Sequence, residues 1–245
     1  MLEVKNIGFT VRDAEKGGDL EIIEDVSFTL EDGKFLVITG PNGGGKSTLA
    51  RLIMGIEQPT KGQIIYNGQD ITSLSITQRA KLGIGYAFQQ PPRFKGLTVR
   101  KLLSLAHGSD LPENECCSYL TKVGLCSMDY LNREVDASLS GGEVKRIEIA
   151  TLMARDLGLA IYDEPEAGID LWSFSMLVQS FRDIAADRNE SVMIISHQER
   201  IMQLADDILV IADGKIRSFG TKKEILPTLL GEFDSKCSLR GDGNA

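Results

Sequence analysis

Long hydrophobic runs are missing from this 245-residue chain. Its longest apolar stretches, such as residues 191–196, fall far short of the roughly 20 residues that a helix needs to cross a bilayer. The first residues, MLEVK, are typical of a strand and not of a secretory signal peptide. The sequence therefore predicts a cytoplasmic protein with neither a membrane span nor a leader.

An excess of positive charge is missing as well. The chain has 27 Lys and Arg against 35 Asp and Glu, which gives a net charge of −8. Nucleic acids and anionic membranes bind surfaces with the opposite charge balance. This composition predicts that neither is the main partner.

Paired cysteines are also absent. The four cysteines are Cys116, Cys117, Cys126 and Cys237, and none belongs to a CxxC pair. Their spacing suits neither a zinc site nor a disulfide framework. We expect reduced thiols that are buried or incidental, and the adjacent pair Cys116 and Cys117 is typical of a packed helix.

The chain does contain a glycine-rich run, GPNGGGKST, that matches the pattern GxxxxGK[ST]. An apolar strand at residues 34–39 precedes it, and an apolar helix pattern at residues 49–54 follows. Glycines let successive N–H groups point into one concavity at a helix N-terminus, where phosphate binds. The sequence thus predicts a nucleoside triphosphate site, with the lysine on the β- and γ-phosphates and the serine on Mg²⁺. The loop residues are Gly40, Pro41, Asn42, Gly43, Gly44, Gly45, Lys46, Ser47 and Thr48.

A second motif, LSGGE, opens the helix pattern of residues 141–156. Ser140 and Glu143 have the spacing of a capping box. Two glycines in a first helical turn cost stability, but they let a phosphate approach a positive helix end. Because Lys46 already takes one side of the nucleotide, this second face predicts a head-to-tail pair of chains. The motif residues are Leu139, Ser140, Gly141, Gly142 and Glu143.

With these motifs in this order, the chain resembles ATP-binding cassette (ABC) ATPases over essentially its whole length. The resemblance implies a single α/β domain, 1–245: a P-loop NTPase core with a parallel sheet, an antiparallel β subdomain and an inserted helical subdomain. We expect the core at 1–90 and 157–233, the helical subdomain at 91–156 with no strand between its helices, and a polar tail at 234–245. The resemblance also implies two cassettes that enclose two ATP molecules, each between one phosphate loop and the facing LSGGE.

The same resemblance assigns the catalytic residues. Residues 159–164 resemble the Walker B strand, in which Asp163 holds Mg²⁺ and Glu164 acts as the general base. Gln89 stands where the family senses Mg²⁺ and the γ-phosphate, and His197 where it contacts the γ-phosphate. Asp170 belongs to the D-loop, which contacts the second cassette. The implied Mg²⁺ ligands are Ser47, Gln89 and Asp163.

One departure concerns the adenine base. ABC ATPases stack it on an aromatic residue near position 11, where this chain has Val11, with Phe9 on the same strand face. We therefore expect base recognition to be weaker or differently built.

Three runs, at residues 87–92, 139–149 and 197–201, are similar to those of SufC, the ATPase of SUF iron–sulfur cluster assembly. Pro165 departs from that family. This resemblance predicts a soluble SufB-like scaffold as partner, driven through the groove near residues 90–97. We expect Pro91 and Pro92 to push residues 93–97 out as a mobile loop with Phe94 as an anchor.

Two alternatives stay open. The first is the ATP-binding subunit of an ABC transporter, which would have a membrane permease as its partner. The second is an ATP-dependent clamp on nucleic acid or the ribosome, against which the acidic composition argues.

Overall fold

A six-stranded sheet forms the centre of the molecule, and the computed structural model describes residues 1–12 and 17–238 around it. Five of its strands are parallel to one another, and one edge strand runs antiparallel to its neighbour. In spatial order the strands are β12 (Lys215–Thr221), β11 (Asp207–Ala212), β3 (Phe35–Thr39), β10 (Ser191–Ile195), β9 (Leu159–Asp163) and β6 (Ile84–Ala87).

The central strands are buried along their whole length because both faces of the sheet are covered. Phe35 and Val37 of β3 belong to one hydrophobic cluster, and the alternating Leu36 and Ile38 belong to another. The first cluster includes residues of the helical insert, and the second includes residues of the antiparallel sheet. The sheet therefore separates two cores.

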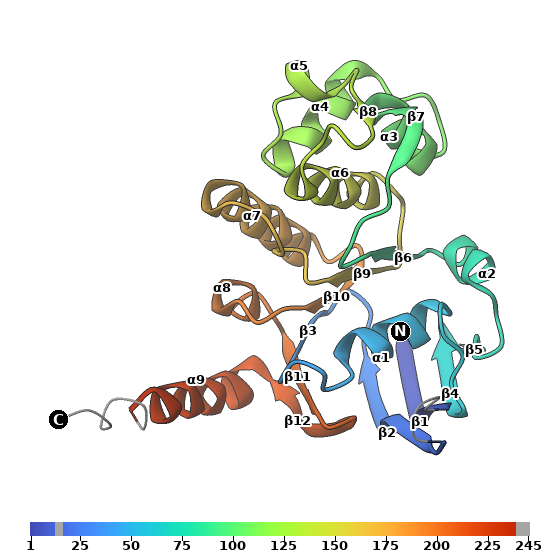
Figure 1. The fold of residues 1–245 in the computed structure, drawn as a ribbon, viewed down its shortest axis with the longest axis vertical. Coiled ribbons are helices and arrows are strands. Elements are labelled where there is room, and N and C mark those ends of the chain that lie inside the picture. Colours follow the sequence, from blue (N-terminus) through green and yellow to red (C-terminus); the bar gives the residue numbers. More distant parts are fainter. Residues whose placement is uncertain (13–16, 239–245) are drawn as a thin grey trace.

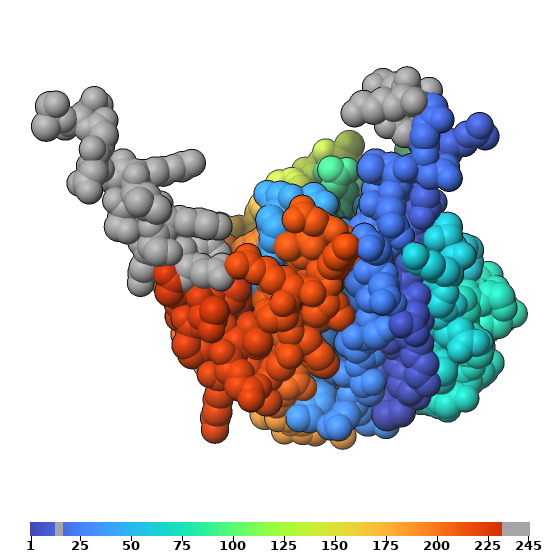
Figure 2. Space-filling view, turned by 90° about the horizontal axis from the view of Figure 1, so that it is seen from below, coloured from blue at the N-terminus to red at the C-terminus, as the bar shows by residue number. Residues whose placement is uncertain are grey.

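A four-stranded antiparallel sheet covers the face of the six-stranded sheet on which Leu36 and Ile38 lie (Figure 1). In spatial order its strands are β2 (Asp19–Leu30), β1 (Leu2–Arg12), β4 (Lys61–Tyr66) and β5 (Gln69–Asp70). Figure 2 shows β12 beside β2, where the rings of Phe28 and Phe219 meet with centroids 6.2 Å apart. The strands β1 and β2 pair antiparallel to each other.

Two helices join these sheets. The helix α1 (Lys46–Met54) begins inside the glycine-rich loop, and α2 (Ile76–Lys81) starts at a Ser75 capping box. The fully buried Arg79 of α2 donates to the carbonyls of Leu52 and Ile53, at 2.6 and 2.8 Å, at the end of α1. Carbonyls that α1 leaves unpaired are satisfied in this way.

The insert forms the upper part of Figure 1. Its helices are α3 (Val99–His107), α4 (Glu113–Lys122), α5 (Ser127–Tyr130) and α6 (Gly141–Met153). The prediction that no strand lies between them is wrong, because β7 (Phe94–Thr98) pairs with β8 (Glu134–Val135).

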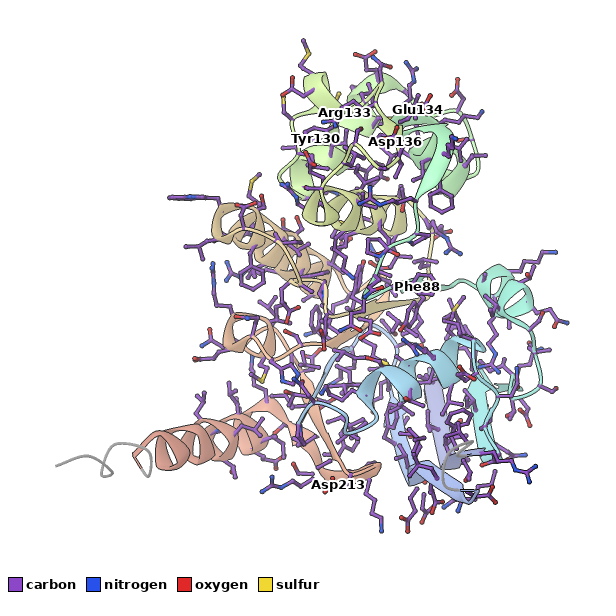
Figure 3. The ribbon with its side chains drawn as sticks, viewed as in Figure 1. Phe88, Tyr130, Arg133, Glu134, Asp136 and Asp213 are labelled. Atoms are coloured by element: carbon purple, nitrogen blue, oxygen red, sulfur yellow. The ribbon has the colours of Figure 1, made fainter. Side chains whose placement is uncertain are left out.

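Residues 93–97 do not form the expected loop either. Arg93 donates to the carbonyls of Asp136 and Leu139, the latter at 2.9 Å, and this holds β7 against the segment around β8. Figure 3 shows Glu134 and Asp136 near Tyr130 and Arg133 at the top of the insert.

The last elements are α7 (Leu171–Asp187), α8 (Glu199–Met202) and α9 (Lys222–Ser238). Asp213 and Gly214 form the turn between β11 and β12, with positive φ angles of 49° and 74° as a type I′ turn requires. The polar tail was expected from 234, but α9 continues to Ser238, because no Gly or Pro stands in residues 232–238 to end it. None of the helices in the described ranges is long and apolar enough to cross a membrane.

Candidate nucleotide-binding site

The carboxyl ends of the parallel strands meet at one edge of the six-stranded sheet. Here the loops after β3, β6, β9 and β10 bring most of the phosphate loop, Gln89, Glu164 and His197 together around a cavity of about 420 Å³, whereas the LSGGE motif and Asp170 do not line it. This edge is where open α/β sheets bind ligands. The cavity is lined by Ile22, residues 42–48, Gln89, Glu164 and His197.

The glycine-rich loop leads directly into α1. Gly45 caps the helix with φ of 101°, and a Cβ there would lie 2.7 Å from the Ile23 side chain, so only glycine fits. Lys46 is 5% exposed, and its ammonium donates to the carbonyls of Gly40 (2.8 Å) and Pro41 (2.9 Å). Burial lowers the pKa of Lys46, and the nearby Glu164 and Asp163 oppose that shift. An anionic ligand would compensate for this buried charge.

Asp163 is 1% exposed and has a partner on each carboxylate oxygen. The Ser47 hydroxyl donates to one oxygen at 2.9 Å, and the Tyr86 hydroxyl to the other at 2.8 Å. A hydroxyl and a carboxylate oxygen at the edge of a phosphate loop are the hard ligands that Mg²⁺ takes, with water and phosphate completing the set. Ser47 and Asp163 therefore fit Mg²⁺. The sequence reasoning missed Tyr86, which lies on the strand next to β9.

Glu164 has the backbone of a strained residue. Its φ is 47°, in the left-handed region, and its N–H donates to the carbonyl of Ile195 at 3.0 Å. The amide of Gln89 donates to the Glu164 carboxylate at 2.8 Å. Gln89 thus contacts Glu164, while Ser47 and Asp163 pair with each other, and the prediction that Gln89 is an Mg²⁺ ligand stays a prediction.

His197 follows β10 and faces the same cavity. Burial and the charge of Lys46 lower its pKa, and Glu164 opposes that shift. The preceding Ser196 donates to the Glu166 carboxylate at 2.6 Å. The sequence reasoning gave no role to Glu166, whose side chain is one of the buried carboxylates of this edge.

The LSGGE motif starts α6 with the predicted capping box. The Ser140 N–H donates to Glu143 at 2.6 Å, and the Glu143 N–H donates to Ser140 at 3.3 Å. The Tyr130 hydroxyl also donates to Glu143, and this bond is the largest cause of the low pKa of Glu143, about 2. The cap stays ionised and aligned at neutral pH.

The two glycines of the motif have different surroundings. A Cβ on Gly142 would lie 2.4 Å from the carbonyl oxygen of Gly168, so this glycine is required by the approach of the chain's own D-loop. A Cβ on Gly141 would meet nothing within 4 Å. Only Gly141 therefore presents an open backbone face at this helix end.

Asp170 of the D-loop caps α7. Its carboxylate accepts the N–H groups of Trp172 and Ser173 at 3.1 and 3.0 Å. The hydrogen bonds to Ser173 are the largest cause of its lowered pKa. The predicted contact of Asp170 with a second cassette stays a prediction.

The helix α6 also holds the chain just before Gln89. Lys145, whose side chain is 1% exposed, donates to the carbonyls of Phe88 and Asp163, the latter at 3.1 Å. Glu148 accepts the Phe88 N–H at 3.0 Å, and burial raises the pKa of Glu148 to about 7. Figure 3 shows Phe88 between the insert and the core. The sequence placed Lys145 and Glu148 in the SufC-like run 139–149 but gave neither of them a role in holding Phe88.

An apolar groove of about 540 Å³ lies beside Phe88. Phe94 and Leu105, which are 39% and 56% exposed, line it together with the charged Glu148 and Arg155. Phe94 therefore lies in the groove wall and not on a projecting loop.

The remaining predictions concern the base and the cysteines. Val11 is exposed, while Phe9 packs on the core and Ile22 lines the cavity. Cys116 is buried in α4, as a packing role requires. Across the described residues, no cluster of His, Cys, Asp and Glu side chains could hold a metal ion by itself.

Comparisons with known proteins point to one family. A family model described as "ABC transporter" matches residues 23–167. An uncharacterized ABC transporter ATP-binding protein of Methanocaldococcus jannaschii is 40% identical over 227 residues, which cover 89% of this chain and 88% of that protein. The sulfate/thiosulfate import ATP-binding protein CysA of Synechocystis is 34% identical over 213 residues, or 85% of this chain and 59% of CysA.

The fold comparison agrees. A solved dimeric ATP-binding cassette in a post-hydrolysis state with ADP and Pi matches 91% of this chain and 99% of that one, with a TM-score of 0.80 and 22% identity. The predicted α/β cassette fold is thereby confirmed. The relatives' names favour the transporter alternative and give no support to the iron–sulfur assembly prediction.

Proposed function

Because the chain belongs to the ABC transporter family of ATPases, which bind ATP with Mg²⁺ and hydrolyse it, we propose that it is the motor subunit of a transport assembly. The observation that carries this proposal is the convergence of four loops on one cavity at the carboxyl edge of the sheet. A cytoplasmic location, where such a motor meets ATP, is part of the proposal.

Each residue of the cavity has a proposed role in hydrolysis. Lys46 neutralises the β- and γ-phosphates, and the N–H groups of residues 42–48 surround them. Ser47 and Asp163 hold Mg²⁺, which would neutralise phosphate charge. Glu164 accepts a proton from the attacking water, and His197 contacts the γ-phosphate. Tyr86 keeps the Asp163 carboxylate in place.

Two copies of the chain form the complete site. The open face of Gly141, at the positive end of α6, is suited to the γ-phosphate of an ATP bound to the other copy. Asp170 caps α7 and fixes the D-loop, residues 167–170. The D-loop of each copy lies beside its own signature motif, LSGGE, where Gly168 touches Gly142. In this head-to-tail pair, ATP draws the copies together and hydrolysis lets them separate.

The groove between core and insert is where we propose that the partner binds. Its walls carry exposed Phe94 and Leu105, and its floor carries Glu148, which also holds Phe88 next to Gln89. Because Gln89 contacts Glu164, a partner in the groove would act on the general base through Phe88 and its neighbour Gln89. In this way residues 91–156 would act as the partner-choosing subdomain of the single domain 1–245.

The partner is a membrane permease in this proposal. CysA is named for sulfate and thiosulfate import, but this chain spans 59% of its length, so that cargo is not assigned here. A soluble SufB-like scaffold is the second candidate. It rests on the resemblance of residues 87–92, 139–149 and 197–201 to SufC.

Affinity purification at endogenous levels with ATP present tests the proposal. We expect a polytopic membrane protein, and we expect Phe94→Ala to weaken its capture by about 1–3 kcal/mol, as for an interface anchor. Leu20→Ala, a similar change at a side chain that is 52% exposed on β2, is the control. A soluble scaffold in place of the permease would establish the second candidate, while equal capture by Phe94→Ala would exclude the groove.

A further inference from the structure

The loop that carries His197 is held by one buried hydroxyl. Ser196 is completely buried, and its backbone N–H donates to the carbonyl of Ile38 at 3.1 Å. Its Oγ accepts the Gln198 N–H at 3.0 Å and donates to Glu166 at 2.6 Å. These bonds bracket His197 from both sides, so the direction of its side chain depends on where Ser196 is held.

The carboxylate of Glu166 is what holds the Ser196 hydroxyl. Its Oε1 accepts the Ser196 hydroxyl, and its Oε2 is buried with no hydrogen-bond partner among the described residues. Burial is the largest cause of its raised pKa, which the Ser196 hydroxyl and the His197 backbone oppose. A buried carboxylate with an unsatisfied oxygen is unfavourable for folding, and such groups persist where they serve a site.

The backbone of Glu166 belongs to the segment between the general base and the D-loop. The Ala167 N–H donates to the Glu164 carbonyl at 3.1 Å, and the Ile169 N–H donates to the Glu166 carbonyl at 3.1 Å. Two residues beyond Glu166, Gly168 lies against Gly142 of the signature motif. The main chain of Glu166 therefore moves with the D-loop, while its side chain holds the His197 loop.

We propose that Glu166 is a positioning residue that links the D-loop to His197. The link rests on the proposed head-to-tail pair, because the second copy is what would contact residues 167–170. When that copy arrives and shifts the D-loop, Glu166 draws Ser196 with it and aligns His197. Hydrolysis then proceeds at full rate only in the pair, which limits loss of ATP by single copies.

The chain carries its own reporter for the first half of this link. Trp172 is its only tryptophan, is 83% exposed, and lies two residues beyond Asp170. Contact with a second copy should change its emission, while binding of ATP to a single copy should leave it unchanged. Emission therefore reports arrival at the D-loop, and the hydrolysis rate reports alignment of His197.

The test compares Glu166→Ala and Ser196→Ala with Glu166→Gln, which retains an acceptor for Ser196. Glu199→Gln is the matched control, since Glu199 is exposed and bonds only the nearby Gln203 in the described structure. We expect Glu166→Ala and Ser196→Ala to lower kcat by about ten- to a hundredfold, the effect of a misplaced catalytic group. The ATP dissociation constant and the ATP-dependent change in Trp172 emission should stay as in the parent chain, and Glu166→Gln should recover most of kcat.

Two results would overturn the proposal: an unchanged kcat in Glu166→Ala, or a loss of kcat that Glu166→Gln shares in full. A parallel loss of Tm and ATP affinity in both alanine variants would show a purely structural role and overturn it as well. Failure of the head-to-tail pair would appear separately, as a Glu164→Gln chain that stays monomeric with Mg·ATP and shows no change in Trp172 emission. In that case the proposed link between the D-loop and His197 is wrong. The kcat of Glu166→Ala still decides whether Glu166 positions His197.

Discussion

Glu148 provides a prediction whose size follows from its surroundings. Its side chain is 12% exposed, and burial raises its pKa from 4.5 to about 7, because the ionised carboxylate is poorly hydrated there. At about 1.4 kcal/mol per pH unit, ionising Glu148 in the folded chain costs about 3 kcal/mol more than in the unfolded chain. Between pH 4.5 and 7 the folded state binds more protons than the unfolded state, so the free energy of unfolding falls as pH rises.

We expect Glu148→Gln to remove this dependence. The amide oxygen can still accept the Phe88 N–H, and Lys145 keeps its bonds to the carbonyls of Phe88 and Asp163. From pH 5 to pH 8, the wild type should lose about 2 kcal/mol of unfolding free energy relative to the variant. Urea unfolding followed by far-UV circular dichroism at both pH values measures this difference.

Glu113→Gln is the control, because the Glu113 side chain is 67% exposed on α4. Burial also raises the pKa of Glu190 to about 7. The pH dependence of the wild-type unfolding free energy therefore contains the contributions of both carboxyl groups. The difference between wild type and Glu148→Gln gives the contribution of Glu148 alone. Parallel pH profiles for wild type and Glu148→Gln would refute the assignment of a raised pKa to Glu148.

Four further variants test the phosphate loop, the general base and the two glycines of the LSGGE motif. Lys46→Ala should lower ATP affinity by more than about a hundredfold, since the phosphates lose their buried charge, and calorimetry showing unchanged binding would exclude the phosphate-loop assignment. Glu164→Gln should bind ATP normally and hydrolyse it about 10²–10⁴-fold more slowly, because an amide accepts no proton, and the ATP-bound pair should accumulate in light scattering. Gly142→Ala should cost about 1–3 kcal/mol of stability by forcing its Cβ onto Gly168, seen as a lower Tm. Gly141→Ala should leave Tm unchanged and impair ATP-dependent pairing, and equal Tm losses in the two variants would contradict this division.

Most of the fold could be predicted because its strands have strong local patterns. Residues 191–196 are apolar without alternation, as a strand covered on both faces must be, and Asp213 with Gly214 fixes a hairpin by its backbone angles. The strand β7 could not be predicted, since β8 is short and its pairing depends on Arg93, which contacts carbonyls more than forty residues away. Long-range contacts of this kind leave no local pattern.

The meeting of Lys46, Glu164 and His197 at one cavity could be expected from the sequence, because a motif fixes both residue type and order, and their roles stay predictions. Tyr86, Lys145 and Glu166 could not be predicted, because each acts through a contact with a residue far from it in the sequence, at or next to the end of a strand. From the sequence, both glycines of the LSGGE motif had one explanation, the approach of a phosphate. The structure gives Gly142 a different one. Gly142 is glycine because of Gly168, which no spacing rule indicates.

The division of the interior by the central sheet has an evolutionary consequence. Alternate residues of β3 belong to separate cores, so a change of volume in the insert, at Leu120 for example, has no direct packing route to residues such as Ile64 behind the sheet. Substitutions on the two faces should therefore combine additively. A lineage could remodel the insert to suit a new partner while the nucleotide side stays under its own selection. The same nucleotide-binding core could then be retained in assemblies that share no other component.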